Sequence, residues 1–197
     1  ESQDGIISQL ERELPQLNGV AADAARYGLA LAQLESGQYV NASQTLDALL
    51  DKEPRRITYV MLQADIARAA QDYPRALDIL EDNLKINPGN HPLTMNYAKT
   101  LELAGEFEQS ARVLERHANQ HPENMNLWYQ LAEVQGRAGN ISKVHQARAE
   151  YYLTIGEFSQ ARDQLNFALA LEQDRLTIAR LRQRQDDIRQ IQERFYR

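Results

Sequence analysis

The chain has 197 residues, of which 43% are hydrophobic and 25% charged, and it carries a net charge of −6 and no cysteine. This composition argues against a disordered chain. The lack of cysteine excludes thiol catalysis, disulfides and thiolate metal sites. Apolar runs fall far short of the roughly 20 residues that a membrane-spanning helix needs, so no membrane span is expected.

The charge is divided unevenly along the chain. From Arg175 onward seven arginines outnumber three acidic residues, a local +4, so residues 1–174 carry −10. An acidic body argues against nucleic acid as a partner, because phosphate binding depends on clustered Lys and Arg. The basic end could contact anionic lipid or an acidic protein surface, although a solvated arginine-rich helix face is the simpler interpretation.

The first expected element is a short amphipathic helix over Ile6–Leu14, ended by Pro15 and followed by a loop through Asn18-Gly19. It is expected to cover the first helical hairpin, or else to pack on a domain upstream. Because the chain starts at Glu1, with neither Met nor a signal-peptide core, we expect a piece of a longer protein. Residues Glu1–Gly5 would then belong to a linker.

A repeat of 34 residues follows. Turn residues recur on this grid at Gly37, Gln71, Gly105 and Gly139. A bulky apolar residue follows each of them at Tyr39, Tyr73, Phe107 and Ile141. Small or slim residues come next at Ala42, Ala76, Ser110 and Val144, and leucines at Leu46, Leu80 and Leu114. Prolines close three of the repeats at Pro54, Pro88 and Pro122.

Each mark has a physical reason. The glycine allows the left-handed turn that ends the first helix of a pair. The small residue lies where two helices cross closely, and the proline ends the second helix by removing a backbone donor. At the departure from this pattern, Gln71 or Asp72 must make the turn, at a cost of about 1 kcal/mol relative to glycine.

The segments between these marks have helical spacing and no strand signal, which predicts an all-α solenoid of stacked helical hairpins. The pattern resembles the tetratricopeptide repeat (TPR) family over residues 23–172. Trp128 stands at that family's early tryptophan position, and Leu131 and Ala132 follow at its spacing.

The grid breaks near its end. A second Gly-Glu-Phe motif at Gly156 comes only 17 residues after Gly139. The helix near Ser142–Thr154 is therefore expected to close the fourth hairpin and open a fifth, with Tyr151 and Tyr152 packed on its two sides.

One long helix is expected from Asp174 to Phe195. Its apolar stripe fits a lid on the last repeat better than a coiled coil, because Gln185 interrupts it. The stripe consists of Ile178, Leu181, Ile188, Ile191 and Phe195. The expected division is a short helix and linker over 1–19, a TPR array of about four and a half hairpins over 20–172, and a capping helix over 173–197.

Catalytic motifs are missing from the sequence. It contains no His-Glu-x-x-His, no P-loop, no Gly-x-Gly-x-x-Gly and no Gly-x-Ser-x-Gly. His117 and His121 are four apart, but His121 precedes Pro122 and no carboxylate is suitably spaced beside them. We expect two surface histidines at a helix end, and neither enzyme activity, nor cofactor, nor metal in this chain.

Protein binding is expected on the face formed by the first helices of the hairpins. Aromatic and Met anchors among mixed charges suit such a surface. The candidates are Tyr27, Leu31, Leu34, Met61, Asp65, Arg68, Met95, Lys99, Glu102, Tyr129, Glu133 and Arg137. TPR domains that bind chaperone tails place Lys and Asn where Tyr27 and Leu31 stand here, so that activity is not expected.

Several blocks show a closer resemblance. Ala25-Arg26-Tyr27-Gly28, Ile86-Asn87-Pro88, Met95-Asn96-Tyr97-Ala98 and Ile188-Arg189-Gln190-Ile191-Gln192-Glu193-Arg194-Phe195 are similar to the C-terminal repeat domain of BepA-type periplasmic zinc metallopeptidases. The resemblance runs from about Gly19 to Phe195. It implies a periplasmic parent with an N-terminal His-Glu-x-x-His protease domain. It also implies partners in the outer-membrane β-barrel assembly machinery and its barrel substrates, besides the chain's own protease domain.

Three functions therefore stay open. The first is the substrate- and partner-recruiting domain of such a metallopeptidase, acting in outer-membrane protein assembly and quality control. The second is a free-standing TPR scaffold or co-chaperone without a protease. The third is a lipid- or polymer-binding adaptor that uses the arginine-rich cap.

Overall fold

The computed structural model describes residues 3–195, which contain eleven α-helices, one 3-10 helix and no strand. The helices are α1 (Gln3–Glu13), η1 (Leu14–Gln16), α2 (Gly19–Glu35), α3 (Tyr39–Leu50), α4 (Ile57–Ala69), α5 (Tyr73–Ile86), α6 (His91–Leu103), α7 (Phe107–Gln120), α8 (Met125–Arg137), α9 (Ile141–Thr154), α10 (Phe158–Leu171) and α11 (Arg175–Phe195). The expected all-α class is confirmed. Of the described helices, none has the length and apolarity needed to cross a membrane.

The chain divides into two compact units. Unit 1 is Glu1–Ala104, which holds α1 to α6, and unit 2 is Gly105–Arg197, which holds α7 to α11. The division falls at Gly105, between the two helices expected to form the third hairpin. Consecutive helices pack against one another inside each unit.

The N-terminal helix covers the first hairpin. Ile7 of α1 is 5% exposed and forms a cluster with Leu29 and Ala32 of α2. The expected linker at Glu1–Gly5 is wrong for Gln3–Gly5, which already belong to α1, whereas Glu1 and Ser2 lie outside the described residues. The expected loop at Asn18-Gly19 is short, because α2 already begins at Gly19.

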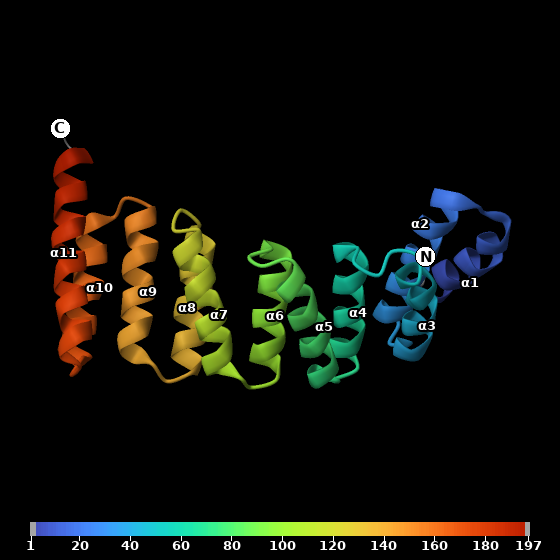
Figure 1. Cartoon of the computed structure of the whole chain (residues 1–197), viewed down its shortest axis with the longest axis horizontal. Helices are drawn as coiled ribbons and strands as arrows, with labels where there is room; N and C mark the ends of the chain where they lie inside the picture. The colour runs from blue at the N-terminus through green and yellow to red at the C-terminus, as the bar shows by residue number, and fades with distance from the viewer. Residues whose placement is uncertain (1–2, 196–197) are drawn as a thin grey trace. The chain divides into compact units, whose positions relative to one another are not determined.

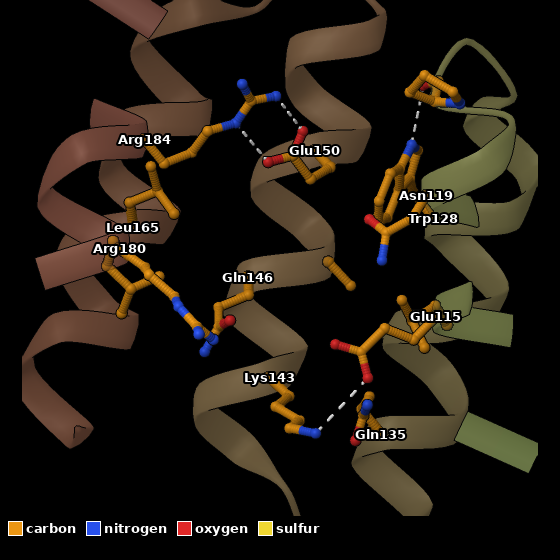
Figure 2. Close-up of a pocket in the computed structure, with 14 residues that line it drawn as sticks. Glu115, Asn119, Trp128, Gln135, Lys143, Gln146, Glu150, Leu165, Arg180 and Arg184 are labelled. Atoms are coloured by element: carbon orange, nitrogen blue, oxygen red, sulfur yellow. Dashed lines mark hydrogen bonds and ion pairs between the residues drawn. The ribbon is translucent and has the colours of Figure 1, made fainter. Parts of the chain in front are cut away.

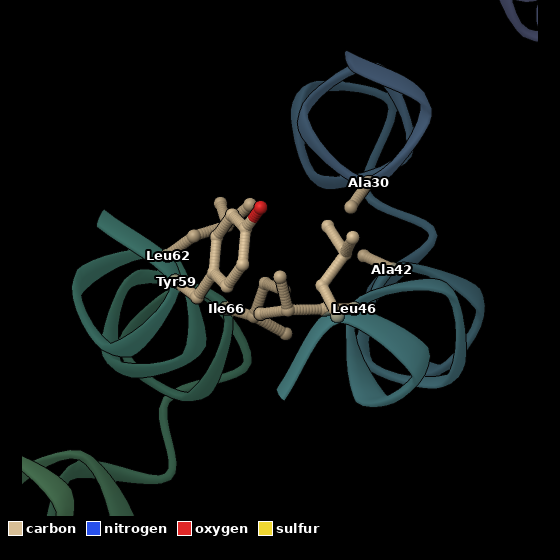
Figure 3. Close-up of a cluster of buried hydrophobic side chains, with 7 residues drawn as sticks. Ala30, Ala42, Leu46, Tyr59, Leu62 and Ile66 are labelled. Atoms are coloured by element: carbon tan, nitrogen blue, oxygen red, sulfur yellow. The ribbon is translucent and has the colours of Figure 1, made fainter. Parts of the chain in front are cut away.

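The core of unit 1 lies between successive hairpins. Figure 3 shows Tyr59, Leu62 and Ile66 of α4 turned toward Leu46 of α3 and Ala30 of α2. Ala30 and Leu46 are 0% exposed. Burial of a large side chain such as that of Leu46 contributes about 1.5–3 kcal/mol, so the contact between hairpins is a main source of stability.

The small residues of the grid lie in the helix crossings. Ala42, Ala76 and Ser110 are each 0% exposed, and Val144 is 8% exposed. The leucines that follow them, Leu46, Leu80 and Leu114, are also fully buried. The repeat marks read from the sequence therefore coincide with buried positions of the hairpins.

Gln71 makes the turn between α4 and α5. Its φ of 61° makes it the one non-glycine residue with positive φ among those the structure describes. The backbone N–H of Asp72 donates to the carbonyl of Ala67 at 2.9 Å, and that of Gln71 to Arg68 at 3.0 Å. Gln71 thus takes the left-handed position of a helix C-cap that glycine takes in the other repeats. The side chain of Asp72 instead caps α5.

Helix α9 belongs to two hairpins, as the half-period break predicts. It packs against both α8 and α10, and Figure 1 shows it between them. The ring of Tyr151 lies 6.2 Å from that of Tyr129 on α8. Tyr152 packs instead against the buried cluster that contains Phe158 of α10. The two tyrosines therefore pack toward different neighbours of α9, while their own rings lie 5.5 Å apart.

The C-terminal helix α11 covers α10. Leu181 and Ile188 are 5% and 0% exposed and join the cluster formed by α9 and α10. Gln185, which interrupts the apolar stripe, donates from Nε2 to Oδ1 of Asn166 on α10 at 2.7 Å. Beyond Ile188 the stripe faces outward, since Phe195 is 71% exposed although its ring lies 5.6 Å from that of Phe158.

Candidate protein-binding surfaces

Nine of the twelve candidate residues lie in unit 1. They are carried by α2, α4 and α6, the first helices of the hairpins, and α4 contacts both of the others. These helices thus form one layer of unit 1. The other three candidates lie on α8 of unit 2.

A closed hydrogen-bonded network joins α4 to α6. Arg68 donates to Oδ1 of Asp65 and to Oδ1 of Asn96, each at 2.5 Å. Asn96 donates in turn from Nδ2 to Oδ1 of Asp65 at 3.1 Å. The network is half-buried and includes two of the candidates, Asp65 and Arg68. Its charges are therefore held in fixed positions on the layer, and a partner would meet them already oriented.

Tyr27 extends this layer across α2. Its ring lies 5.9 Å from that of Tyr59 on α4. Burial, and next the negative charge of Asp65, raise the pKa of Tyr27 above its ordinary value of 10.0. The phenol therefore stays protonated at neutral pH and keeps its O–H donor. A cleft of about 300 Å³ opens beside the two rings, with Val20, Ala24 and Arg56 among its walls.

The remaining candidates of unit 1 differ in how far their side chains are exposed. Leu31 and Leu34 are half-buried and pack against the same core cluster as Tyr27, so a large part of each serves the fold. Met61 packs in the same way against the cluster formed by α4, α5 and α6. Met95 and Glu102 are half-buried, and Lys99 is exposed.

The candidates of unit 2 are exposed on α8. Tyr129 is 57% exposed, with the ring of Tyr151 as its neighbour. Glu133 and Arg137 are exposed as well. The structure thus brings the candidates together within α2, α4 and α6, while those of α8 form a separate set in the other unit.

A second surface, unforeseen in the sequence, is a pocket of about 340 Å³ in unit 2. Trp128 and Leu131 of α8, Ala147 of α9 and Leu165 of α10 supply apolar walls. The indole N–H of Trp128 donates to the carbonyl of Pro122 at 2.9 Å, which fixes the ring. Its polar walls come from α7, α9 and α11, and from Gln135 of α8.

Ion pairs join the helices that carry these polar walls. Figure 2 shows Arg184 of α11 bonded to Glu150 of α9, and Lys143 of α9 paired with Glu115 of α7. The Lys143–Glu115 separation is 3.6 Å.

Arg189 of α11 pairs with Asp186 at 3.5 Å. Two arginines of the basic end therefore have acidic partners, which leaves less of its charge for a lipid surface.

Sequence reasoning missed Asn96 and the pocket. For Asn96 the repeat gave no signal, because the same grid position holds Gly28, Leu62 and Gln130 in the other repeats. The pocket had no signal either, because it depends on which helices lie beside α9.

The histidine prediction needs correction. His117 is 2% exposed, because it follows Leu114 on the buried face of α7. Its ring lies 4.7 Å from that of His121, and Glu123 approaches His121 at 3.9 Å, a carboxylate that the spacing did not suggest. Within the described residues, no group of three or more His, Cys, Asp or Glu could hold a metal ion.

Comparisons with known proteins agree with this architecture. A family model described as "Tetratricopeptide repeat" matches residues 67–134. The structure of MamA from Desulfovibrio magneticus RS-1 superposes with a TM-score of 0.57 at 17% identity, covering 88% of this chain and 98% of that one. At this identity the likeness concerns the fold alone.

The sequence comparison is more specific than the structural one. The chain is 33% identical over 193 residues to the β-barrel assembly-enhancing protease of Escherichia coli (strain K12), covering 96% of this chain. The protein of the same name in Yersinia pestis is 28% identical over 174 residues, covering 87% of this chain. The chain spans 39% and 36% of the length of these two relatives. The chain is therefore an array of tetratricopeptide repeats, similar in sequence to part of the β-barrel assembly-enhancing proteases.

Proposed function

We propose that this chain is the domain that recruits partners and substrates for a periplasmic zinc metallopeptidase acting in outer-membrane protein assembly and quality control. The single observation that supports this most is the 33% identity across 96% of the chain to a β-barrel assembly-enhancing protease. TPR domains mediate protein–protein interaction. On this proposal the β-barrel assembly machinery and unassembled barrel proteins are partners, and proteolysis is carried out by another domain.

We propose two separate contact surfaces, one in each unit: the layer of α2, α4 and α6 in unit 1, and the exposed Tyr129 of α8 in unit 2. Tyr27, Met61 and Met95 supply adaptable apolar contacts. The Asp65–Arg68–Asn96 network supplies charges that are already ordered, so binding need not order them again.

Reading the parent gene separates this proposal from its alternative. A His-Glu-x-x-His helix encoded upstream of Glu1 is expected. An upstream region without that motif would leave the free-standing scaffold or co-chaperone, which the similarity to a protease does not favour.

Crosslinking in the envelope of the source organism tests the surface. Tyr27→Asp, Met95→Asp and Tyr129→Asp, made singly in the full-length parent, are each expected to lower crosslinking to the β-barrel assembly machinery. Val40→Asp is the matched control, because Val40 is 71% exposed on α3, outside that layer. If the three variants crosslink like the control, with equal helicity by circular dichroism, the contact surface lies elsewhere.

A further inference from the structure

We infer that Asn18 is a site of spontaneous covalent modification, in which the backbone nitrogen of Gly19 attacks the side chain of Asn18 and the asparagine becomes aspartate or isoaspartate. The inference goes beyond the proposed function and does not depend on it. It rests on the junction between η1 and α2, where both residues are exposed and both reacting groups lack a hydrogen-bonding partner among the described residues.

The sequence at this junction favours the attack. Asn18 is the one asparagine of the chain that glycine follows. A side chain on the following residue would hinder the approach of its nitrogen to Cγ of the asparagine, whereas nothing lies within 4 Å of the place where a Cβ of Gly19 would stand. Closing the ring also requires rotation about the Cα–C bond of Asn18, whose ψ is 158°. Gly19 can follow this rotation, because glycine tolerates backbone conformations that other residues disfavour.

The side chain of Asn18 is unbonded, unlike those of the other asparagines that precede a helix. Asn18, Asn90, Asn124 and Asn140 are the N-caps of α2, α6, α8 and α9. The side chains of Asn90 and Asn124 accept backbone N–H donors at 3.1 Å, and that of Asn140 donates to Gln135 at 2.9 Å. Such bonds hold the side-chain amide in one position. Asn18 makes none with the described residues, so its amide carbon is able to turn toward the backbone.

The attacking nitrogen is unbonded as well. Gly19 is the first residue of α2, and the first backbone N–H groups of a helix have no acceptor inside it. In the part of the chain that the structure describes, nothing else accepts from this N–H. The N-terminus of a helix also carries partial positive charge, which stabilises the negative charge that the nitrogen gains when base removes its proton.

Asn41 has the opposite arrangement, although it too is exposed and is followed by a small residue. It lies inside α3, where its side-chain amide donates to Oε1 of Gln38 at 3.0 Å. The backbone nitrogen of Ala42 donates to the carbonyl of Gln38 at 2.9 Å. Both reacting groups are therefore held apart in the folded chain, and Asn41 is expected to be stable.

The reaction needs no reagent other than water. The nitrogen of Gly19 forms a bond to Cγ of Asn18, the bond from Cγ to Nδ2 breaks, and Nδ2 leaves as ammonia with the proton that Gly19 has lost. Water then opens the cyclic imide. Addition at Cγ gives aspartate, and addition at the backbone carbonyl carbon gives isoaspartate, in which the chain runs through the side chain. Either product puts a carboxylate at the N-terminus of α2, two residues before Val20 in the wall of the cleft beside Tyr27.

Incubation of the full-length parent above neutral pH, followed by peptide mapping with mass spectrometry, tests the inference. Isoaspartate is expected to accumulate in the peptide that contains Asn18, and faster as the pH rises, because the deprotonated nitrogen is the one that attacks. The peptide that contains Asn41 is expected to stay unmodified over the same period. Isoaspartate is the diagnostic product, since direct hydrolysis of the side-chain amide gives aspartate alone.

Two variants separate the effect of the structure from that of the sequence. Asn18→Gln should lose the product, because the longer side chain would have to close a larger ring. Phe167→Gly is the matched control, because it places glycine after Asn166, which is exposed inside α10 and is followed by a nitrogen bonded within the helix. Asn166 should stay intact in this folded variant while Asn18 reacts, and both should react alike in urea. Circular dichroism melts check that both variants are folded.

Absence of isoaspartate at Asn18 in the folded protein would overturn the inference. Equal rates at Asn18 and Asn166 in the folded Phe167→Gly variant would also overturn it, because the pair of residues rather than the structure would then select the site. Aspartate formed without isoaspartate would show direct hydrolysis in place of ring closure, which again contradicts the inference. None of these results bears on the proposed function, which crosslinking through α2, α4 and α6 tests separately.

Discussion

Arg184 of α11 donates two parallel hydrogen bonds to the carboxylate of Glu150 on α9. One runs from Nε to Oε1 at 2.7 Å, and the other from Nη2 to Oε2 at 2.5 Å. The hydrogen bonds raise the pKa of Arg184, and the side chains are 35% and 21% exposed. This pair spans 34 residues and ties the C-terminal helix to the helix shared by two hairpins.

Arg184→Gln is therefore expected to lower the free energy of unfolding by about 1 kcal/mol, since the bidentate pair is only partly screened by water. It should also speed amide hydrogen exchange in α11 more than in α8. Arg189→Gln is the control, because its pair with Asp186 is 60% and 56% exposed and lies within one helix. Equal effects of both substitutions would mean that the Arg184–Glu150 pair does not hold α11 in place.

Gln71 stores strain that glycine would relieve. Gln71→Gly is expected to raise the free energy of unfolding by about 1 kcal/mol, because the left-handed conformation disfavours a side chain. The control is Gln130→Gly, at an exposed position inside α8. It should lower the free energy of unfolding by about 1 kcal/mol, because a helix interior disfavours glycine. Urea denaturation measures the free energy of unfolding of both variants. Destabilisation by Gln71→Gly would show that this turn is unstrained in solution.

The features that the sequence predicted correctly are local. The sequence placed a left-handed turn at Gln71 or Asp72, and the structure has it at Gln71. The small residues at Ala42 and Ala76 and the helix shared through Gly156 likewise follow from neighbours close in the sequence. The twelve candidate surface residues stay a prediction, since their placement on α2, α4, α6 and α8 does not test binding.

What sequence reasoning missed depends on partners far along the chain. Arg68 donates a hydrogen bond to Asn96, 28 residues away in the sequence, and Arg184 donates to Glu150, 34 residues away. Neither spacing predicts a contact until the packing of helices is known. His117 was misplaced for a simpler reason. Its distance from Pro122 suggested an exposed helix end, yet its position three residues after Leu114 puts it on the buried face of α7.

Ala76→Phe tests the helix crossing of the second hairpin. Ala76 is 0% exposed, so a phenyl ring there must displace the neighbouring helix and should cost about 1–3 kcal/mol in unfolding free energy. Ala69→Phe, at the exposed end of α4, is the matched control and should change it little. Thermal melts followed by circular dichroism compare the two. A neutral Ala76→Phe would mean that the 34-residue register misplaces the crossing.

The start of α11 should be sensitive to acid. Oδ2 of Asp174 accepts hydrogen bonds from the hydroxyl and the backbone N–H of Thr177, at 2.7 and 2.8 Å. These bonds, the side-chain one first, lower the pKa of Asp174 below its ordinary value of 3.8. The folded state therefore favours the carboxylate, so the stabilisation is complete above pH 3.8 and is lost as the pH falls through the lower folded pKa.

Amide hydrogen exchange of the first turn of α11, compared with that of α8 between pH 5 and pH 2.5 after correction for intrinsic rates, measures this loss. The wild-type turn is expected to open as the pH falls below the ordinary Asp value. Asp174→Asn is the matched control, because its side chain can still cap the helix but does not titrate in this range. Its opening should be independent of pH. If Asp174→Asn shows the same acid-induced opening, another carboxylate is responsible and the Asp174 cap does not carry the pH dependence.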